Sequence, residues 1–151
     1  MSPMDAALSY LTGRMRTVRE VEDRLDELQY GEGDILITVE RLKELNLLND
    51  EEYAREFVRS RLATKPVSCQ KLYTDLRAHH VPEELIEAAL DALPEETESD
   101  NALEVARKFW RQMSGLEQGA RRERVLRRLM SRGFSTEASL AAIRDVEEEE
   151  P

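Results

Sequence analysis

The sequence predicts an all-α protein of three tandem three-helix repeats that form an elongated, curved array. Apolar residues recur at helical spacing along most of the chain, helix-capping residues precede several of these stretches, and one apolar pattern returns three times. Of the 151 residues, 40% are hydrophobic and mostly aliphatic, and only 5% are aromatic. This composition favours helices.

Residues 1–48 are predicted to form the first repeat. Thr17 and Glu20 have the spacing of a capping box, in which each side chain satisfies the backbone amide of the other residue. Glycines in the Gly31–Asp34 turn interrupt the helical pattern before the third helix. That helix begins with β-branched residues, but its apolar spacing favours a helix over a strand. The expected helices are Asp5–Arg14, Thr17–Leu28 and Ile35–Leu45, the last with a stripe of Ile35, Leu36, Val39, Leu42 and Leu45.

Residues 49–94 are predicted to form the second repeat. Asn49 and Asp50 are capping residues, and the carboxylates that follow them complement the positive end of a helix. Pro66 ends this helix, and Pro82 suits the first turn of another. The expected helices are Asn49–Leu62, Ser68–His79 and Pro82–Leu93.

Residues 95–146 are predicted to form the third repeat, which opens with an acidic connector at Glu95–Asp100. Residues 147–151 are expected to be a solvated acidic tail, although the Glu147–Glu150 run could compete with DNA for the arginines on the outer arc of Ala120–Arg132. The expected helices are Leu103–Met113, Ala120–Arg132 and Ser135–Val146. The expected inner face of the middle one is Val125, Leu126, Leu129 and Met130.

The repeated pattern starts from three anchors, Leu25, Leu76 and Leu129. The positions five, fourteen and seventeen residues after each anchor are apolar in all three copies. Because the agreement is free of gaps across two helices and the turn between them, coincidence is a poor explanation. These positions are Tyr30, Val81 and Phe134; Val39, Leu90 and Ile143; and Leu42, Leu93 and Val146. Neighbouring three-helix units would bury what each unit cannot cover alone.

Arg41–Leu48 reads Arg-Leu-Lys-Glu-Leu-Asn-Leu-Leu, and Asn49–Leu62 continues with Asn-Asp-Glu-Glu-Tyr-Ala-Arg-Glu-Phe-Val-Arg-Ser-Arg-Leu. This stretch resembles the central signature of the RecX family, bacterial regulators of the RecA recombinase. The resemblance is also good over Arg122–Ile143, where Arg-Arg-Leu-Met-Ser-Arg-Gly-Phe precedes the last helix. It is weakest over Gly31–Ile37 and Pro94–Asp100.

The resemblance implies a regulatory protein that binds the RecA–single-stranded DNA filament along its groove. Such a protein inhibits or modulates the recombinase and ATPase activities of RecA in DNA repair and the SOS response. It acts by occupancy, so no catalysis, cofactor or small-molecule substrate is implied.

The overall charge and the cysteine count limit the possible partners and the compartment. The formal charge of −10 argues against unaided adhesion to nucleic acid or to an acidic membrane. A single cysteine, Cys69, excludes an internal disulfide and fits a reducing cytosol. Met1–Leu11 lacks the features of a secretory signal, and no apolar run approaches the roughly 20 residues of a membrane span. We therefore expect a cytoplasmic, monomeric protein whose contact with nucleic acid is weak or indirect.

No group of residues indicates an enzyme site or a metal site. His79 and His80 are adjacent, so they point to different sides of a helix, and Cys69 is ten residues from His79. Gly31 and Gly33 lack the strand and the lysine of a phosphate-binding loop. Cys69 is expected to be half-buried and the two histidines to face solvent.

Basic residues are concentrated in the third repeat. Pro82–Glu104 contains nine acidic residues and no basic one, whereas Val105–Phe134 contains nine basic residues against Glu117 and Glu123. On a helical wheel, an outer arc of Ala120–Arg132 holds Arg121, Arg124, Arg127 and Arg128. This arc would contact DNA phosphates or acidic groups of RecA, or it would simply be a solvated face. The candidate contact residues are Arg107, Lys108, Arg111, Arg121, Arg124, Arg127, Arg128 and Arg132, with Arg59 and Arg61 of the signature helix.

A stand-alone DNA-binding module of the helix-turn-helix type is the alternative, because short three-helix units resemble one. However, Ile35–Leu45 and Pro82–Leu93 have the wrong charge for helices that read a DNA groove. Trp110, Tyr53 and Phe57 could stack on unpaired bases, but their positions on apolar stripes favour core packing. Tyr73 is the better candidate for an exposed aromatic residue.

Overall fold

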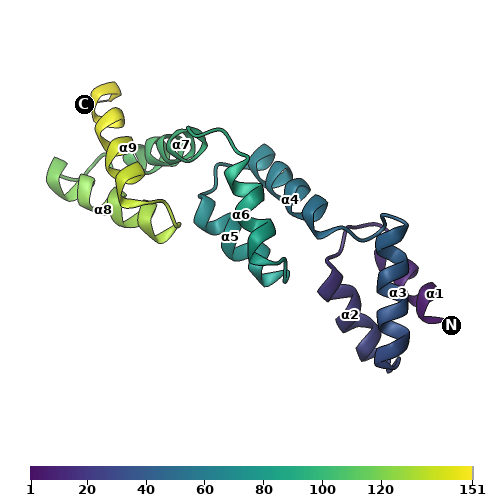
Figure 1. Cartoon of the computed structure of the whole chain (residues 1–151). Helices are drawn as coiled ribbons and strands as arrows, with labels where there is room; N and C mark the ends of the chain where they lie inside the picture. Colours follow the sequence, from purple (N-terminus) through teal and green to yellow (C-terminus); the bar gives the residue numbers. More distant parts are fainter. Residues whose placement is uncertain (151) are drawn as a thin grey trace. The chain divides into compact units, whose positions relative to one another are not determined.

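The computed structural model describes residues 1–150, which contain nine α-helices and no β-strand (Figure 1). In chain order the helices are α1 (Pro3–Leu11), α2 (Val18–Glu27), α3 (Glu32–Glu44), α4 (Asp50–Thr64), α5 (Cys69–Ala78), α6 (Glu83–Asp91), α7 (Thr97–Gln112), α8 (Gln118–Ser131) and α9 (Thr136–Glu149). The predicted all-α class is confirmed. None of these helices is both long and apolar enough to cross a membrane.

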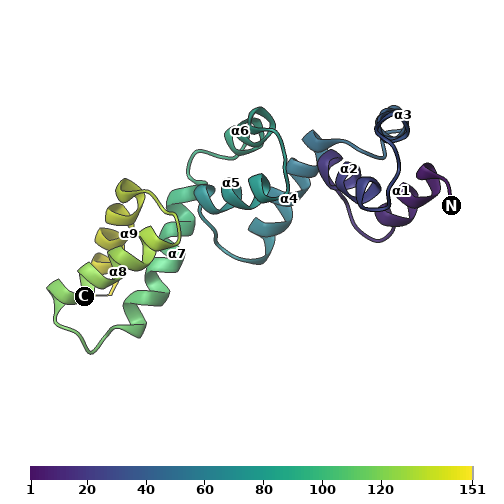
Figure 2. The same cartoon turned by 90° about the horizontal axis from the view of Figure 1, so that it is seen from below.

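The chain divides into two compact units, and the division passes through α4, α5 and α6. The first unit comprises residues 1–58 and 75–89, and the second comprises residues 59–74 and the chain from Leu90 onward. In the first unit, α1, α2 and α3 pack around a core that includes Val21, Leu25, Val39 and Leu42. In the second unit, α7, α8 and α9 pack on one another (Figure 2) around Phe109, Trp110, Val125, Leu129, Ile143 and Val146.

The second helix of each repeat, α2, α5 or α8, ends in the same motif. The residue four places after each anchor has a left-handed backbone, with φ of 68° at Gln29, 64° at His80 and 93° at Gly133. The amide of the next residue then donates to the carbonyl of the anchor across 3.2 Å, in the pairs Tyr30–Leu25, Val81–Leu76 and Phe134–Leu129. This bond and the left-handed residue define a Schellman motif, in which the residue after the turn packs back on the helix. The apolar position five residues after each anchor therefore has a structural cause, and the predicted three-helix repeat is confirmed.

Local sequence signals place most helix ends. The capping box of α2 is present, because the Thr17 hydroxyl accepts from the Glu20 amide at 3.2 Å and the Glu20 carboxylate accepts from the Thr17 amide at 3.0 Å. The predicted connector at residues 95–100 is wrong in its second half, since α7 begins at Thr97. Its first-turn carboxylates, Glu98 and Asp100, complement the helix dipole, so they extend the helix toward its N-terminus.

The predicted apolar stripes are too broad at three positions. Leu36, Leu45 and Met130 are 61%, 47% and 45% exposed. Leu36 and Met130 directly follow the buried residues Ile35 and Leu129, so each is rotated by about 100° from its helix's buried face. The expected core positions of Trp110 and Tyr53 are confirmed, and Phe57 and Tyr73 are half-buried.

Candidate functional site

Four arginines follow one side of α8 and together form what we call the α8 arginine stripe. Arg121, Arg124, Arg128 and Arg132 are three, four and four residues apart, so their side chains lie above one another along the helix. Arg132 is the C-cap residue. The buried Val125 is adjacent to this side of the helix, and the stripe therefore borders the core.

Aromatic rings of α7 lie beside the stripe and orient three of its members. The guanidinium of Arg121 lies 4.0 Å from the ring centroid of Trp110 and donates to the Trp110 carbonyl at 2.9 and 2.6 Å. The guanidinium carbons of Arg128 and Arg132 lie 5.3 and 5.0 Å from the Phe109 centroid. Such cation–π contacts limit the motion of a side chain without neutralising its charge.

The helical wheel placed Arg121 on the outer arc of the helix, and this prediction is wrong. It is half-buried, because its planar guanidinium covers the indole face and both donor groups reach a backbone carbonyl. Arg124, Arg128 and Arg132 are exposed. Hence the outward-facing part of the stripe consists of these three residues.

Three other arginines are paired with the end of α9, in contacts that the sequence analysis did not predict. Glu149 accepts two hydrogen bonds from Arg107, at 2.9 and 2.7 Å. Glu147 accepts two from Arg122, at 2.7 and 2.6 Å, and Glu150 accepts one from Arg111 at 3.1 Å. We call Glu147, Glu149 and Glu150 the α9 acidic turn.

The predicted solvated tail is therefore wrong for residues 147–150. Helix α9 continues to Glu149, and the Trp110 indole N–H donates to the Glu150 carbonyl at 3.1 Å. The hydrogen bond from Arg122 lowers the pKa of Glu147, against a smaller opposing effect of burial, and the hydrogen bond from Arg107 lowers the pKa of Glu149 in the same way. These two carboxylates are ionised at neutral pH and offset the positive charge of Arg122 and Arg107.

The ten predicted contact residues therefore differ in availability. Arg107 and Arg111 are paired with α9, and Arg127 with Glu123 at 3.0 Å. Arg59 is exposed and Arg61 half-buried on α4, and both interact with other side chains or backbone groups. Four predicted residues are exposed and form no ion pair within residues 1–150, namely Lys108, Arg124, Arg128 and Arg132.

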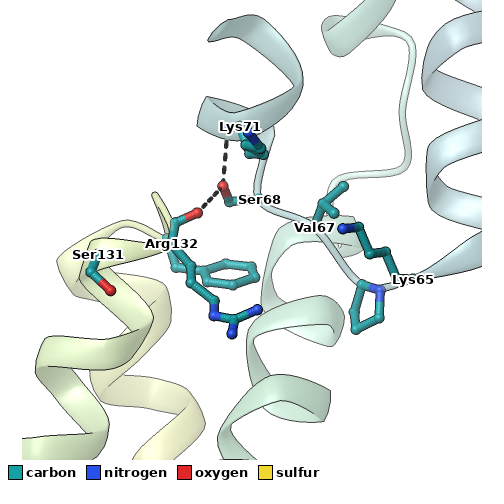
Figure 3. A pocket seen from close by; sticks show the side chains of 8 residues that line it. Lys65, Val67, Ser68, Lys71, Ser131 and Arg132 are labelled. Carbon is teal, nitrogen blue, oxygen red and sulfur yellow. Dashed lines mark hydrogen bonds between the residues drawn. The ribbon is translucent and has the colours of Figure 1, made fainter. Parts of the chain in front are cut away.

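The stripe ends at a pocket that the sequence analysis missed (Figure 3). Arg132, Ser131 and Phe134 line one side, and the segment that joins α4 to α5 lines the other. That segment contributes Lys65, Pro66, Val67 and Ser68, and the first turn of α5 adds Lys71. A sequence signal exists, since Lys65 and Lys71 flank Pro-Val-Ser-Cys-Gln, but nothing local links them to Arg132, which is more than 60 residues away along the chain.

Comparison with known proteins identifies the family. Family models of the three RecX domains match the chain in order. The model described as "RecX, first three-helix domain" matches residues 4–42, that of the second three-helix domain matches residues 49–90, and that of the third matches residues 96–143. "Regulatory protein RecX" of Prosthecochloris aestuarii is 33% identical over 136 residues, which are 89% of this chain and 86% of that protein. The chain belongs to the RecX family.

Other RecX proteins agree in sequence and fold. "Regulatory protein RecX" of Bacillus subtilis is 29% identical over 143 residues, which are 95% of this chain but 54% of that protein, so the chain spans about half the length of this relative. The crystal structure of RecX from Lactobacillus salivarius matches with a TM-score of 0.91 and 25% identity, and covers 97% of this chain and 95% of that one. The predicted family is confirmed, and it is a family of regulatory proteins.

His79 of this RecX protein does not face solvent, contrary to the prediction. Its Nδ1 atom lies 3.0 Å from a Glu20 carboxylate oxygen, and its ring centroid lies 5.8 Å from that of Tyr53 and 5.7 Å from that of Phe57. The histidine is half-buried because Glu20 and the two rings surround it, whereas His80 is exposed at the left-handed turn position.

Cys69 is half-buried, as predicted, and its thiol is poorly suited to nucleophilic chemistry. Burial, together with the charge and the hydrogen bond of Glu98, raises the pKa of Cys69 to about 11. The thiolate, which is the reactive form, is therefore scarce at neutral pH. Within residues 1–150, no group of three His, Cys, Asp or Glu side chains is placed to hold a metal ion.

Proposed function

We propose that this RecX protein binds the RecA–single-stranded DNA filament along its groove and inhibits or modulates the recombinase and ATPase activities of RecA, in DNA repair and the SOS response. The observation that supports this proposal most strongly is the outward-facing part of the α8 arginine stripe. Arg124, Arg128 and Arg132 are exposed on one side of a helix and form no ion pair with a carboxylate within residues 1–150. They stand out in a chain with a net charge of −10.

The chemistry of the stripe suits the two kinds of group that such a filament presents. A guanidinium donates two parallel N–H bonds to a phosphate or to a carboxylate, and both groups accept them with matching geometry. The α8 stripe would therefore contact either the DNA backbone or acidic side chains of RecA. Because the chain has a net charge of −10, affinity for naked DNA is expected to be weak and to fall steeply with salt.

Tandem repeats also explain how binding without chemistry would regulate a filament. Several weak contacts on one chain act together, because the first contact raises the effective concentration of the others. A protein that contacts neighbouring RecA subunits shifts the filament toward the state to which it binds more tightly. Inhibition then requires only occupancy of that state.

Filament binding by charge-reversed variants tests the proposal. In fluorescence anisotropy with labelled protein and preformed RecA–single-stranded DNA filaments, Arg124→Glu/Arg128→Glu should bind about tenfold to a hundredfold more weakly than the parent, because carboxylates that repel acidic groups replace the guanidinium donors. Arg77→Glu/Arg144→Glu is the matched control, since both arginines are exposed and the change in charge is identical. Equal binding by the two double variants would contradict the assignment of the stripe.

The helix-turn-helix alternative has no specific observation in its favour. The third helix of each repeat would have to read a DNA groove, yet α6 exposes Glu83, Glu84, Glu87 and Asp91. Such a helix is repelled by phosphates. A sequence-specific footprint on duplex DNA would favour the alternative.

A further inference from the structure

Successive repeats are connected by two joints of the same construction. In the first joint, the Thr17 hydroxyl, which caps α2, donates to the His79 carbonyl at 2.7 Å. In the second joint, the Ser68 hydroxyl, at the start of α5, donates to the Arg132 carbonyl at 2.7 Å. Thr17 and Ser68 both lie eight residues before an anchor leucine, and His79 and Arg132 both lie three residues after one.

A second hydrogen bond also repeats in the two joints. The first amide of α2, at Val18, donates to the Asp50 carboxylate at 2.9 Å. The first amide of α5, at Cys69, donates to the Glu98 carboxylate at 2.7 Å. Both carboxylates come from the first turn of the next repeat's first helix. The joints can therefore be compared position by position.

The joints differ at one pair of side chains. In the first joint, a carboxylate oxygen of Glu20, three residues after Thr17, lies 3.0 Å from Nδ1 of His79, and the Tyr53 and Phe57 rings lie beside the imidazole. The equivalent positions of the second joint are Lys71 and Arg132. Two cations cannot form the pair that occupies the first joint.

A pocket of about 270 Å³ lies at this place in the second joint. Its eight lining residues include three cations, Lys65, Lys71 and Arg132, and no carboxylate. Figure 3 shows that Lys65 and Arg132 extend toward the pocket from opposite sides. Acidic residues outnumber basic ones by 32 to 22 in the chain, so a cationic pocket without an acidic residue is a local reversal of its overall charge.

We propose that this pocket binds a phosphate group between Lys65 and Arg132. Arg132 would donate its two parallel N–H groups to phosphate oxygens while its guanidinium stays on the Phe109 ring, and Lys65 would add a point charge from the opposite wall. The volume is slightly below the range of about 300–1,000 Å³ that is typical of drug-sized ligands, so it suits a phosphate group better than a whole nucleotide.

The phosphate has two possible sources, a free phosphate compound or the backbone of a nucleic-acid strand. Arg124, Arg128 and Arg132 rise along the helix by about 6 Å per step, which is comparable with the separation of successive phosphates along one strand. The strand is therefore the favoured source. This assignment of the source rests on the proposed function, whereas the affinity of the pocket for phosphate does not.

Titration of the isolated protein with inorganic phosphate tests the pocket. Amide resonances of Ser68 and Gly133, which flank it, should shift in a saturable way by NMR, and they should also shift with the oligonucleotide dT12. Lys65→Ala/Arg132→Ala should reduce both affinities at least fivefold, whereas Arg77→Ala/Arg144→Ala, which removes the same charge from exposed positions elsewhere, should leave the phosphate affinity unchanged. Equal phosphate affinity in the two double variants would overturn the proposal.

A second variant keeps the test decisive if the double variant is unstable. Lys71→Glu places a carboxylate at the position that Glu20 has in the first joint, so it should pair with Arg132, preserve the fold and abolish the phosphate-induced shifts. Retained shifts in this variant would count against the pocket.

The two sources and the proposed function can be separated. If a backbone phosphate is bound, the log–log salt dependence of dT12 binding should be shallower in Lys65→Ala/Arg132→Ala than in the parent, by about 0.7 for each phosphate that the variant no longer neutralises. An unchanged slope with abolished phosphate binding would assign the pocket to free phosphate compounds and overturn the strand as its source. Saturable phosphate binding in a protein that does not affect RecA would support the pocket and refute the proposed function.

Discussion

Alanine at Gly133 should destabilise the second joint through two effects that the structure separates. Gly133 has a φ of +93°, and a β-carbon placed on it would lie 2.6 Å from the Ser68 hydroxyl oxygen and 3.1 Å from the Gln70 β-carbon. The strained backbone costs about 1–3 kcal/mol. Displacement of the Ser68 hydroxyl from the Arg132 carbonyl adds roughly 0.5–1.5 kcal/mol. The expected decrease in the free energy of unfolding is therefore about 2–4 kcal/mol.

Gly13→Ala is the matched control, because Gly13 has a similar φ of +88° but no atom within 4 Å of the added β-carbon. Gly13→Ala should therefore lose only the part of the free energy of unfolding that the strained backbone costs. Urea unfolding of both variants, followed by circular dichroism and by Trp110 fluorescence, gives the change in the free energy of unfolding for each. The comparison holds if the dependence of this free energy on urea concentration, the m-value, is the same as in the parent. The reasoning would be refuted if Gly133→Ala were no less stable than Gly13→Ala.

Three further predictions concern charge and protonation. Replacing all three glutamates of the α9 acidic turn by glutamine should release the arginines paired with them and strengthen binding of dT12. The slope of log affinity against log salt concentration should become steeper by up to about 2. An unchanged slope in anisotropy titrations would contradict this prediction. Burial raises the pKa of Glu20, but hydrogen bonds from His79 and the Thr17 amide outweigh it and lower the folded-state pKa below 4.5. The stabilising charge of Glu20 is thus fully present above about pH 4.5 and lost as the pH falls through the folded-state value. Glu20→Gln should be less stable than the parent at pH 7, and chemical denaturation should show this difference shrink toward pH 3; a constant difference would refute the linkage. Because its pKa is raised to about 11, Cys69 should react with iodoacetamide at pH 8 much more slowly in the folded protein than in urea, and equal rates would contradict its burial.

The sequence predicted the features of the fold that depend on neighbouring residues. The Thr17–Glu20 capping box, the apolar position after each Schellman turn and the buried Trp110 all follow from residue type and local spacing. The width of the buried apolar face of each helix was less predictable, because Leu36 and Met130 differ from their buried neighbours only by a rotation around the helix.

The site depends on contacts between residues far apart in the sequence, and these could not be predicted. The α9 acidic turn has the composition of a solvated tail, and only the packing of α9 on α7 brings Glu149 to Arg107. Likewise, the helical wheel placed Arg121 outside because it contains no information about the Trp110 ring on the neighbouring helix. The pocket at Arg132 was missed for the same reason.

The rate of ATP hydrolysis by RecA on single-stranded DNA, measured while this protein is added to saturation, tests the central claim most directly. We predict a dose-dependent fall in turnover for the parent and for Arg77→Glu/Arg144→Glu, and a fall displaced to about tenfold or more higher concentration for Arg124→Glu/Arg128→Glu. Unchanged turnover at a concentration where anisotropy shows the filaments to be saturated would contradict regulation by occupancy.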